Sequence, residues 1–133
     1  MKRVRINSAV VLAGFLTATG VLHFASPPFF DQIVPRALPG PPRCWTYLSG
    51  AAELGVAAAL AVPRTRRLGG WGAAALFVAV LPANVQMAID WQDRPLPDRL
   101  VAYGRLPLQI PLIVWALWIA RSKPRRITSR VDG

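Results

Sequence analysis

Four long apolar runs alternate with short polar or basic segments along the chain. They cover residues 6–25, 45–62, 68–89 and 104–120. A helix of about 20 residues is about 30 Å long, which matches the hydrocarbon core of a bilayer. The fourth run is clearly apolar only over residues 106–120, Pro107 and Pro111 make it irregular, and a polar loop that includes Arg105 is expected over residues 90–105 before it. The pattern predicts an all-α fold, a four-helix transmembrane bundle that forms a single domain over residues 1–133, with a basic tail at 121–133.

The segment between the first two runs is rich in proline. Residues 26–43 contain six prolines, which exclude one continuous helix. Ser26 is placed to cap a short helix that has Pro27 at its first position. Apolar side chains would then share one face of it, namely Phe29, Phe30, Ile33 and Val34. We expect a short interfacial helix on the outer membrane surface, followed by a proline-stiffened turn.

The third run contains a proline and begins with a cluster of glycines. Pro82 lacks a backbone donor and leaves the carbonyl of Val78 without its usual partner, so we expect a kink. The glycines of residues 69–72 follow no predicted strand, so they indicate a helix start rather than a nucleotide site. Two stripes of small residues predict close helix contacts. They are Ala9, Ala13 and Thr17 in the first run, and Ala51, Gly55 and Ala59 in the second.

Positive charge is concentrated in short blocks between the apolar runs. The formal net charge is +10, although 53% of the residues are hydrophobic. Eleven of the sixteen Lys and Arg residues lie in the amino terminus, the 63–67 turn and the tail. Because cytoplasmic loops are enriched in Lys and Arg, we expect a multi-pass protein with both termini in the cytoplasm. The blocks provide no basic face on a soluble domain, which argues against a nucleic-acid partner.

The first run also has features of a secretory signal peptide, because a basic start precedes its apolar stretch. A cut after Ala25 would place His23 where a small residue is expected. The apolar stretch is also longer than the core of most signal peptides. We therefore expect a retained first helix.

Four polar side chains interrupt the apolar runs: His23, Glu53, Asn84 and Gln109. A carboxylate at the depth of Glu53 costs about 2.5–3.5 kcal/mol on insertion scales, so the other helices should shield it from lipid. Thr46 and Ser49 share one helix face with Glu53. We expect these polar groups to line a small cavity that opens outward, with Glu53 at its floor.

Two interpretations of this polar cluster remain open. In the first, the cluster is purely structural. Glu53 is then protonated or pairs with His23, and the side-chain amides of Asn84 and Gln109 link helices through hydrogen bonds worth about 0.6 kcal/mol each. Alternatively, the cluster holds the head group of a lipophilic molecule such as a quinone or a phenol. One His and one intramembrane Glu fall short of a usual metal site, and the single Cys44 allows no intrachain disulfide. No catalytic motif identifies an enzyme, and the catalytic residues stay unknown.

Four segments, in this order, resemble the DoxX-like family of small bacterial integral membrane proteins. They are GVLHF (20–24), PFFDQIVPRALPGP (28–41), SGAAELG (49–55) and VLPANVQMA (80–88). The resemblance covers roughly residues 9 to 120 and implies a four-helix bundle in the cytoplasmic (inner) membrane of a bacterium. The family's motif positions include His23, Ser49, Glu53 and Asn84.

Some relatives in the DoxX-like family are linked to thiosulfate:quinone oxidoreduction and to membrane redox complexes. The resemblance therefore implies a membrane subunit of a redox system, with a quinone as cofactor and a redox protein as partner. Such a subunit would have no redox centre of its own. The alternatives are a non-catalytic scaffold or assembly protein, and a small transporter or proton relay. A homo-oligomer is compatible with each of them.

Overall fold

The protein is all-helical over the residues that its structure, a computed structural model, describes. These are residues 2–122, with side chains described from residue 8 onward. The helices are α1 (Lys2–Ala25), α2 (Pro27–Asp31), α3 (Pro42–Ala61), α4 (Arg66–Ala79), α5 (Leu81–Asp90) and α6 (Leu96–Ala120). The predicted all-α class is confirmed. Most of the predicted basic tail lies outside the described residues.

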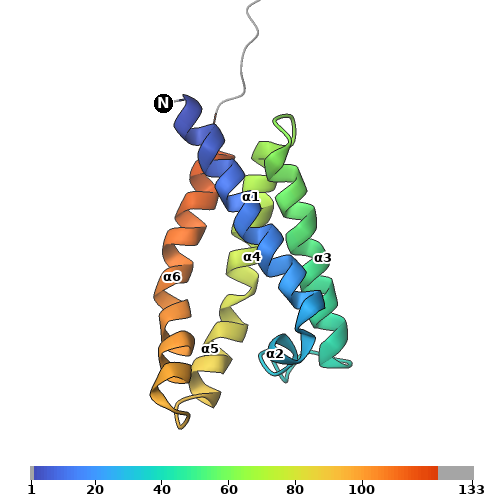
Figure 1. The fold of residues 1–133 in the computed structure, drawn as a ribbon, viewed down its shortest axis with the longest axis vertical. Helices are drawn as coiled ribbons and strands as arrows, with labels where there is room; N and C mark the ends of the chain where they lie inside the picture. Colours follow the sequence, from blue (N-terminus) through green and yellow to red (C-terminus); the bar gives the residue numbers. More distant parts are fainter. Residues whose placement is uncertain (1, 123–133) are drawn as a thin grey trace, which may run out of the picture.

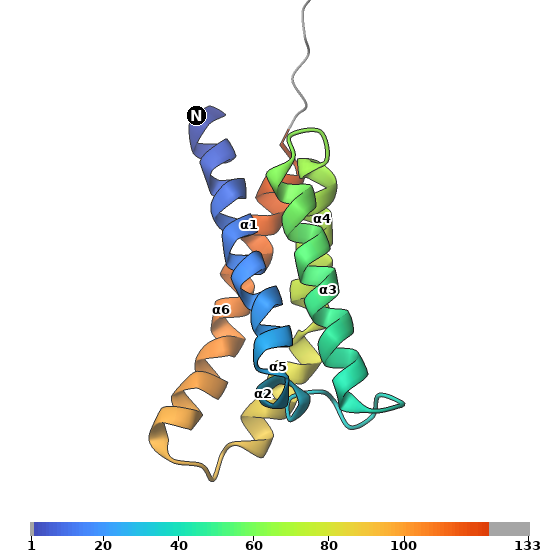
Figure 2. The same cartoon turned by 45° about the vertical axis from the view of Figure 1, so that its right-hand side comes forward.

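Two helix pairs form the body of the molecule. α1 packs along α3, and α4 packs along α6, while α3 and α4 join the two pairs (Figure 1). The start of α1, the α3–α4 turn and the end of α6 lie together at one end (Figure 2). This is the basic end, because the 63–67 turn belongs to it. α2 and the α5–α6 turn lie at the opposite end.

Three segments are long and apolar enough to cross a membrane, judged by length and composition. They are Ser8–Ala25, Arg66–Asp90, which comprises α4 and α5, and Leu96–Ala120. These segments suggest a membrane protein. α3 has 20 residues, Glu53 among them, and is therefore long enough as well, but it is not one of these three segments.

α6 begins earlier than the sequence predicted. Its first residue is Leu96, whereas the predicted span began at 104 and residues before it were expected to form a polar loop. Pro97 lies in the first turn, where a missing backbone donor costs nothing. Pro107 and Pro111 are accommodated inside the helix. Because of the early start, the loop between α5 and α6 is short and Arg105 belongs to the helix.

The expected kink in the third run is present as a break between two helices. α4 ends at Ala79 and α5 begins at Leu81, directly before Pro82. Gln109 of α6 donates from Nε2 to the carbonyl oxygen of Phe77, at 2.7 Å. Gln109 is buried, so its amide links α6 to the end of α4 in the protein interior.

Replacing Gln109 with leucine is expected to lower the free energy of unfolding by about 1–2 kcal/mol, since the carbonyl of Phe77 loses a buried donor. Thermal unfolding in detergent measures this change. Gln92→Leu is the control, because Gln92 is exposed in the α5–α6 turn. Equal stability of the two variants would contradict a structural role for the Gln109 amide.

The closest helix contacts do not involve both predicted stripes of small residues. Ala9 and Ala13 are buried, as expected, whereas Thr17 and Ala51 are exposed and a Cβ on Gly55 would meet nothing within 4 Å. A Cβ on Gly50 would instead lie 2.7 Å from the Cβ of His23. The prediction for α3 was therefore wrong at Ala51 and Gly55, because the face that contains Gly50 packs against α1. It is right at Ala59, whose carbonyl carbon would lie 2.9 Å from a Cβ on Gly69 of α4.

The basic turn between α3 and α4 also closes helix ends. Arg66 donates to the carbonyls of Leu60 and Ala61, at 2.9 and 3.2 Å. Arg67 donates to the carbonyl of Ala120 at the end of α6, at 3.2 Å. The last carbonyls of a helix have no partners within it, and cationic donors are the groups best suited to satisfy them. This turn thus connects the carboxyl ends of α3 and α6.

Candidate functional site

Glu53 and His23 form an ion-pair contact between α3 and α1. Nδ1 of His23 lies 3.2 Å from Oε2 of Glu53, and the two side chains are 11% and 16% exposed. Gly20 and Gly50 permit this contact, because their helices approach closely enough that a Cβ on either would touch the other helix. The sequence predicted this pair as one of two outcomes for Glu53.

The proton on His23 is directed at the backbone. Nδ1 lies 2.7 Å from the carbonyl oxygen of Thr19, one turn earlier in α1. A carbonyl oxygen can only accept, so Nδ1 must carry the proton. Glu53 Oε2 therefore lies beside the ring without receiving a well-aligned hydrogen bond. Among the described residues it is a buried oxygen without a hydrogen-bond donor.

α2 covers the imidazole of His23. The ring of Phe30 stacks on it with a centroid distance of 3.8 Å and an interplanar angle of 18°. Ile33, just after α2, is buried in a cluster with Met87 and Trp91. The apolar face that was expected to rest on the membrane surface is thus directed in part at the protein. Ser26 occupies the N-cap position, but its side chain forms no capping hydrogen bond.

Asp31 fastens the end of α2 to the start of α3. Its Oδ1 accepts from Thr46 at 2.7 Å, and its Oδ2 accepts from Nε of Arg43 at 2.8 Å. The hydroxyl of Thr46 is therefore committed to Asp31, although the sequence had placed it in the cavity above Glu53. Ser49, from the same predicted set, is half-buried.

The bonds to Asp31 make this attachment dependent on pH. Burial is the largest influence and raises the pKa of the Asp31 carboxyl, but the hydrogen bonds from Thr46 and Arg43 outweigh it, so the pKa lies below its ordinary value. A lowered folded-state pKa stabilises the protein above the unfolded pKa, about 4 for an aspartate, and this stabilisation is lost as the pH falls through the folded pKa.

The stability advantage of the wild type over Asp31→Asn is therefore expected to be constant near neutral pH and to shrink below about pH 4. Thermal unfolding of both proteins in detergent, over a series of pH values, measures this advantage. A difference that does not change on acidification would show that the Asp31 carboxylate does not secure α2.

The loop after α2 is held against α5. The side-chain amide of Gln86 accepts from the backbone N–H of Arg36 at 3.1 Å and donates to the carbonyl of Val34 at 3.2 Å. The guanidinium of Arg36 forms two bonds to Asp90, at 3.0 and 3.1 Å. Side-chain bonds therefore connect this loop to the α4–α6 half of the molecule, while Asp31 connects α2 to α3.

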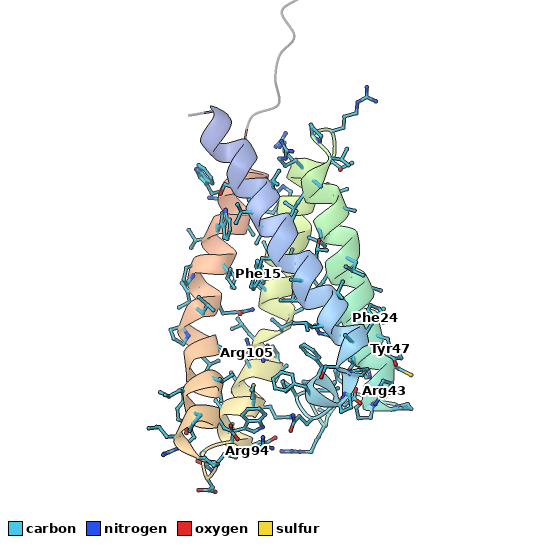
Figure 3. All side chains as sticks on the ribbon, in the orientation of Figure 1. Phe15, Phe24, Arg43, Tyr47, Arg94 and Arg105 are labelled. Carbon is cyan, nitrogen blue, oxygen red and sulfur yellow. The ribbon has the colours of Figure 1, made fainter. Side chains whose placement is uncertain are left out.

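Arg105 is a site residue that the sequence analysis missed. It lies on α6, in the lower half of the molecule (Figure 3), and its side chain is half-buried. Nη1 contacts the sulfur of Met87 at 3.6 Å, and Glu53 and His23 lie within electrostatic range of the guanidinium. Arg105 had been assigned to a loop, yet its spacing of four residues from Gln109 places both on one helix face.

The two amides predicted for the site have different environments. Gln109 is bonded to the backbone of α4, as described above. Asn84 is 1% exposed, and its Oδ1 is buried without a hydrogen-bond donor among the described residues. Asn84 lies in the first turn of α5, just after the break between α4 and α5. Glu53, His23 and Arg105 together are called the polar centre below; among the described residues no hydrogen bond or ion pair joins the Asn84 side chain to them.

Two hollows on the surface lie away from His23 and Glu53. One is lined by α5 together with the Arg36–Asp90 pair, and the other is an apolar depression between α4 and α6. No group of three or more His, Cys, Asp or Glu residues in the described part of the chain could hold a metal ion. The carboxylate, imidazole and guanidinium of the polar centre offer hydrogen bonding and charge.

The family model described as "Domain of unknown function (DUF8561)" matches residues 12–120. The chain belongs to the DUF8561 family. The match includes Asn84 and the three residues of the polar centre, so these residues lie within the DUF8561 domain. It adds no support for the DoxX-like resemblance, which stays a prediction. No curated protein and no solved structure matches the chain.

Proposed function

We propose that this DUF8561 protein is a four-span protein of a bacterial inner membrane, with α3 as its fourth span and both termini in the cytoplasm. α3 supports this count because it packs along α1, one of the three candidate spans. The clustering of the 63–67 turn with the start of α1 and the end of α6 supports the orientation, since cytoplasmic ends are basic. α2 then lies at the outer interface.

Cys44 tests this orientation, because it is the single cysteine of the chain and is exposed at the start of α3. A membrane-impermeant maleimide added to intact spheroplasts is expected to label it. A Cys44→Ser variant with a new cysteine at Thr65, in the basic turn, should be labelled only after the membrane is broken. The opposite labelling pattern would reverse the proposed orientation.

The polar centre is proposed to bind the head group of a lipophilic molecule of the quinone or phenol class. One observation carries this function: Glu53 Oε2 is buried beside the His23 ring and lacks a donor among the described residues. A buried acceptor that lacks its donor costs about 1–3 kcal/mol, and more when charged, and a ligand hydroxyl would remove that cost. The protein would serve as the membrane subunit of a redox system, with a separate redox protein as partner.

A scaffold or assembly protein is the second candidate, and a different observation favours it. The amides of Gln109 and Gln86 bond to backbone groups of other elements, so these polar side chains fix packing. In this alternative the Glu53–His23 pair only holds α1 against α3.

Glu53→Gln separates the two candidates. With a ligand site, the variant is expected to unfold at nearly the wild-type temperature, and hydroxyl-bearing molecules of the quinol or phenol class that accompany the wild type through anaerobic purification should be depleted from it. Mass spectrometry of lipid extracts measures this loss. Asp98→Asn is the control, because it changes a carboxylate of the α6 start outside the polar centre. Extracts of wild type and variant that contain the same bulk phospholipid and no quinol, quinone or phenol would favour the scaffold.

A further inference from the structure

Arg105 carries a charge into a candidate membrane span. Arginine within a span is costly, so such residues usually face the protein interior or a cavity and bind an anion or backbone carbonyls. Among the described residues, the one hydrogen-bond acceptor near its guanidinium is the sulfur of Met87, a weak acceptor. Arg36 and Arg43, in contrast, both have carboxylate partners. The donors of Arg105 are therefore left for an oxygen acceptor.

Glu53 presents the complementary group. It lies on α3, its Oε2 lacks a hydrogen-bond donor among the described residues, and it is within electrostatic range of Arg105. The two residues form no direct ion pair, since the contact of Glu53 is with His23. A ligand with one oxygen that accepts from Arg105 and one hydroxyl that donates to Glu53 would satisfy both residues at once.

Aromatic rings define the character of the head group. The ring of His23 lies beside Glu53, the ring of Phe30 stacks on that imidazole, and Phe30 makes an edge contact with Phe29. An aromatic head group finds apolar ring surfaces there. Aliphatic acids would bring a second negative charge next to Glu53, which opposes their binding.

We propose that Arg105 is a ligand-binding residue and that the polar centre selects the reduced, quinol form of its ligand, in which one hydroxyl donates to Glu53 Oε2 while the other oxygen accepts from Arg105. A quinone has two acceptor oxygens and no donor, so it satisfies Arg105 and leaves Glu53 without a partner. This inference rests on the proposed function. It adds the redox form of the ligand that binds preferentially, and it names Arg105 as the residue that binds the oxygen opposite the hydroxyl on Glu53.

The test compares 2-decylhydroquinone, 2-decyl-1,4-benzoquinone and 2-decyl-1,4-dimethoxybenzene by anaerobic titration calorimetry with the full chain in detergent. The wild type is expected to bind the hydroquinone at least about tenfold more tightly than either other probe. Arg105→Gln should weaken the hydroquinone and the benzoquinone alike, by about 10- to 100-fold. Glu53→Gln should weaken the hydroquinone by about fivefold or more and leave the benzoquinone unchanged.

Arg36→Gln is the matched control, because it removes an arginine that pairs with Asp90 outside the polar centre, and it should leave all three affinities unchanged. Arg105→Lys keeps the charge if Arg105→Gln does not fold, and should retain part of the affinity. Benzoquinone binding that equals hydroquinone binding, or that Arg105 variants do not change, would overturn the inference while the proposed function stands. If no probe binds the wild type, both fail.

Discussion

Replacing Gly50 with alanine is expected to lower the free energy of unfolding by about 1–3 kcal/mol, even though alanine is the better helix former. The new Cβ would lie 2.7 Å from the Cβ of His23 and 2.8 Å from the ring of Phe24. The Cβ of His23 is fixed by the α1 backbone, so α1 and α3 must move apart. Unfolding in detergent micelles, followed by circular dichroism, measures the loss.

Gly55→Ala is the matched control for this substitution. Gly55 lies in the same helix, and a Cβ added to it would meet nothing within 4 Å. Alanine there should be neutral or stabilise by up to about 1 kcal/mol through helix propensity. If both variants lose the same stability, the close approach of α1 and α3 at Gly50 does not exist in the protein.

Replacing His23 with alanine is expected to have a still larger effect, about 2–4 kcal/mol. The variant loses the stack on Phe30 and leaves the carboxyl of Glu53 without its neighbour in a site that is 16% exposed. Removing one partner of a buried pair costs more than removing both, because the remaining charge has no compensation.

The double variant His23→Ala with Glu53→Gln should therefore be more stable than the sum of the two single changes indicates. A double-mutant cycle of unfolding free energies gives this coupling, which we expect to be about 1–2 kcal/mol. Leu22→Ala, an exposed neighbour in α1, controls for truncation of the helix surface. Strict additivity would mean that His23 and Glu53 do not interact.

The helices could be predicted because lipid-compatible helices have a strong sequence signal. Long apolar runs gave α1, α3, the α4–α5 pair and most of α6, and Pro82 located the break. The start of α6 was missed because residues 96–105 are polar on average, while a helix at the end of a span can contain charged residues on one face. That error in turn hid Arg105, whose importance depends on its being helical.

The candidate site could be predicted only in part. The contact between Glu53 and His23 follows from the need to shield a carboxylate, and the structure contains it. The partner of Thr46 did not follow, since Asp31 lies in a proline-rich segment whose path periodicity does not predict. The inward direction of Ile33 was equally inaccessible, because an apolar face fits lipid and protein alike.

The two arginines that begin α4 have a consequence for experiments that manipulate insertion. Arg66 and Arg67 bond to backbone carbonyls at the ends of two helices. Neutralising them to invert the protein in the bilayer would also fray those ends, so misinsertion and unfolding would occur together. Lysine substitutions would keep the positive charge that sets membrane orientation but would weaken the hydrogen bonds to the helix ends. They would therefore allow membrane insertion and folded-state stability to be studied separately.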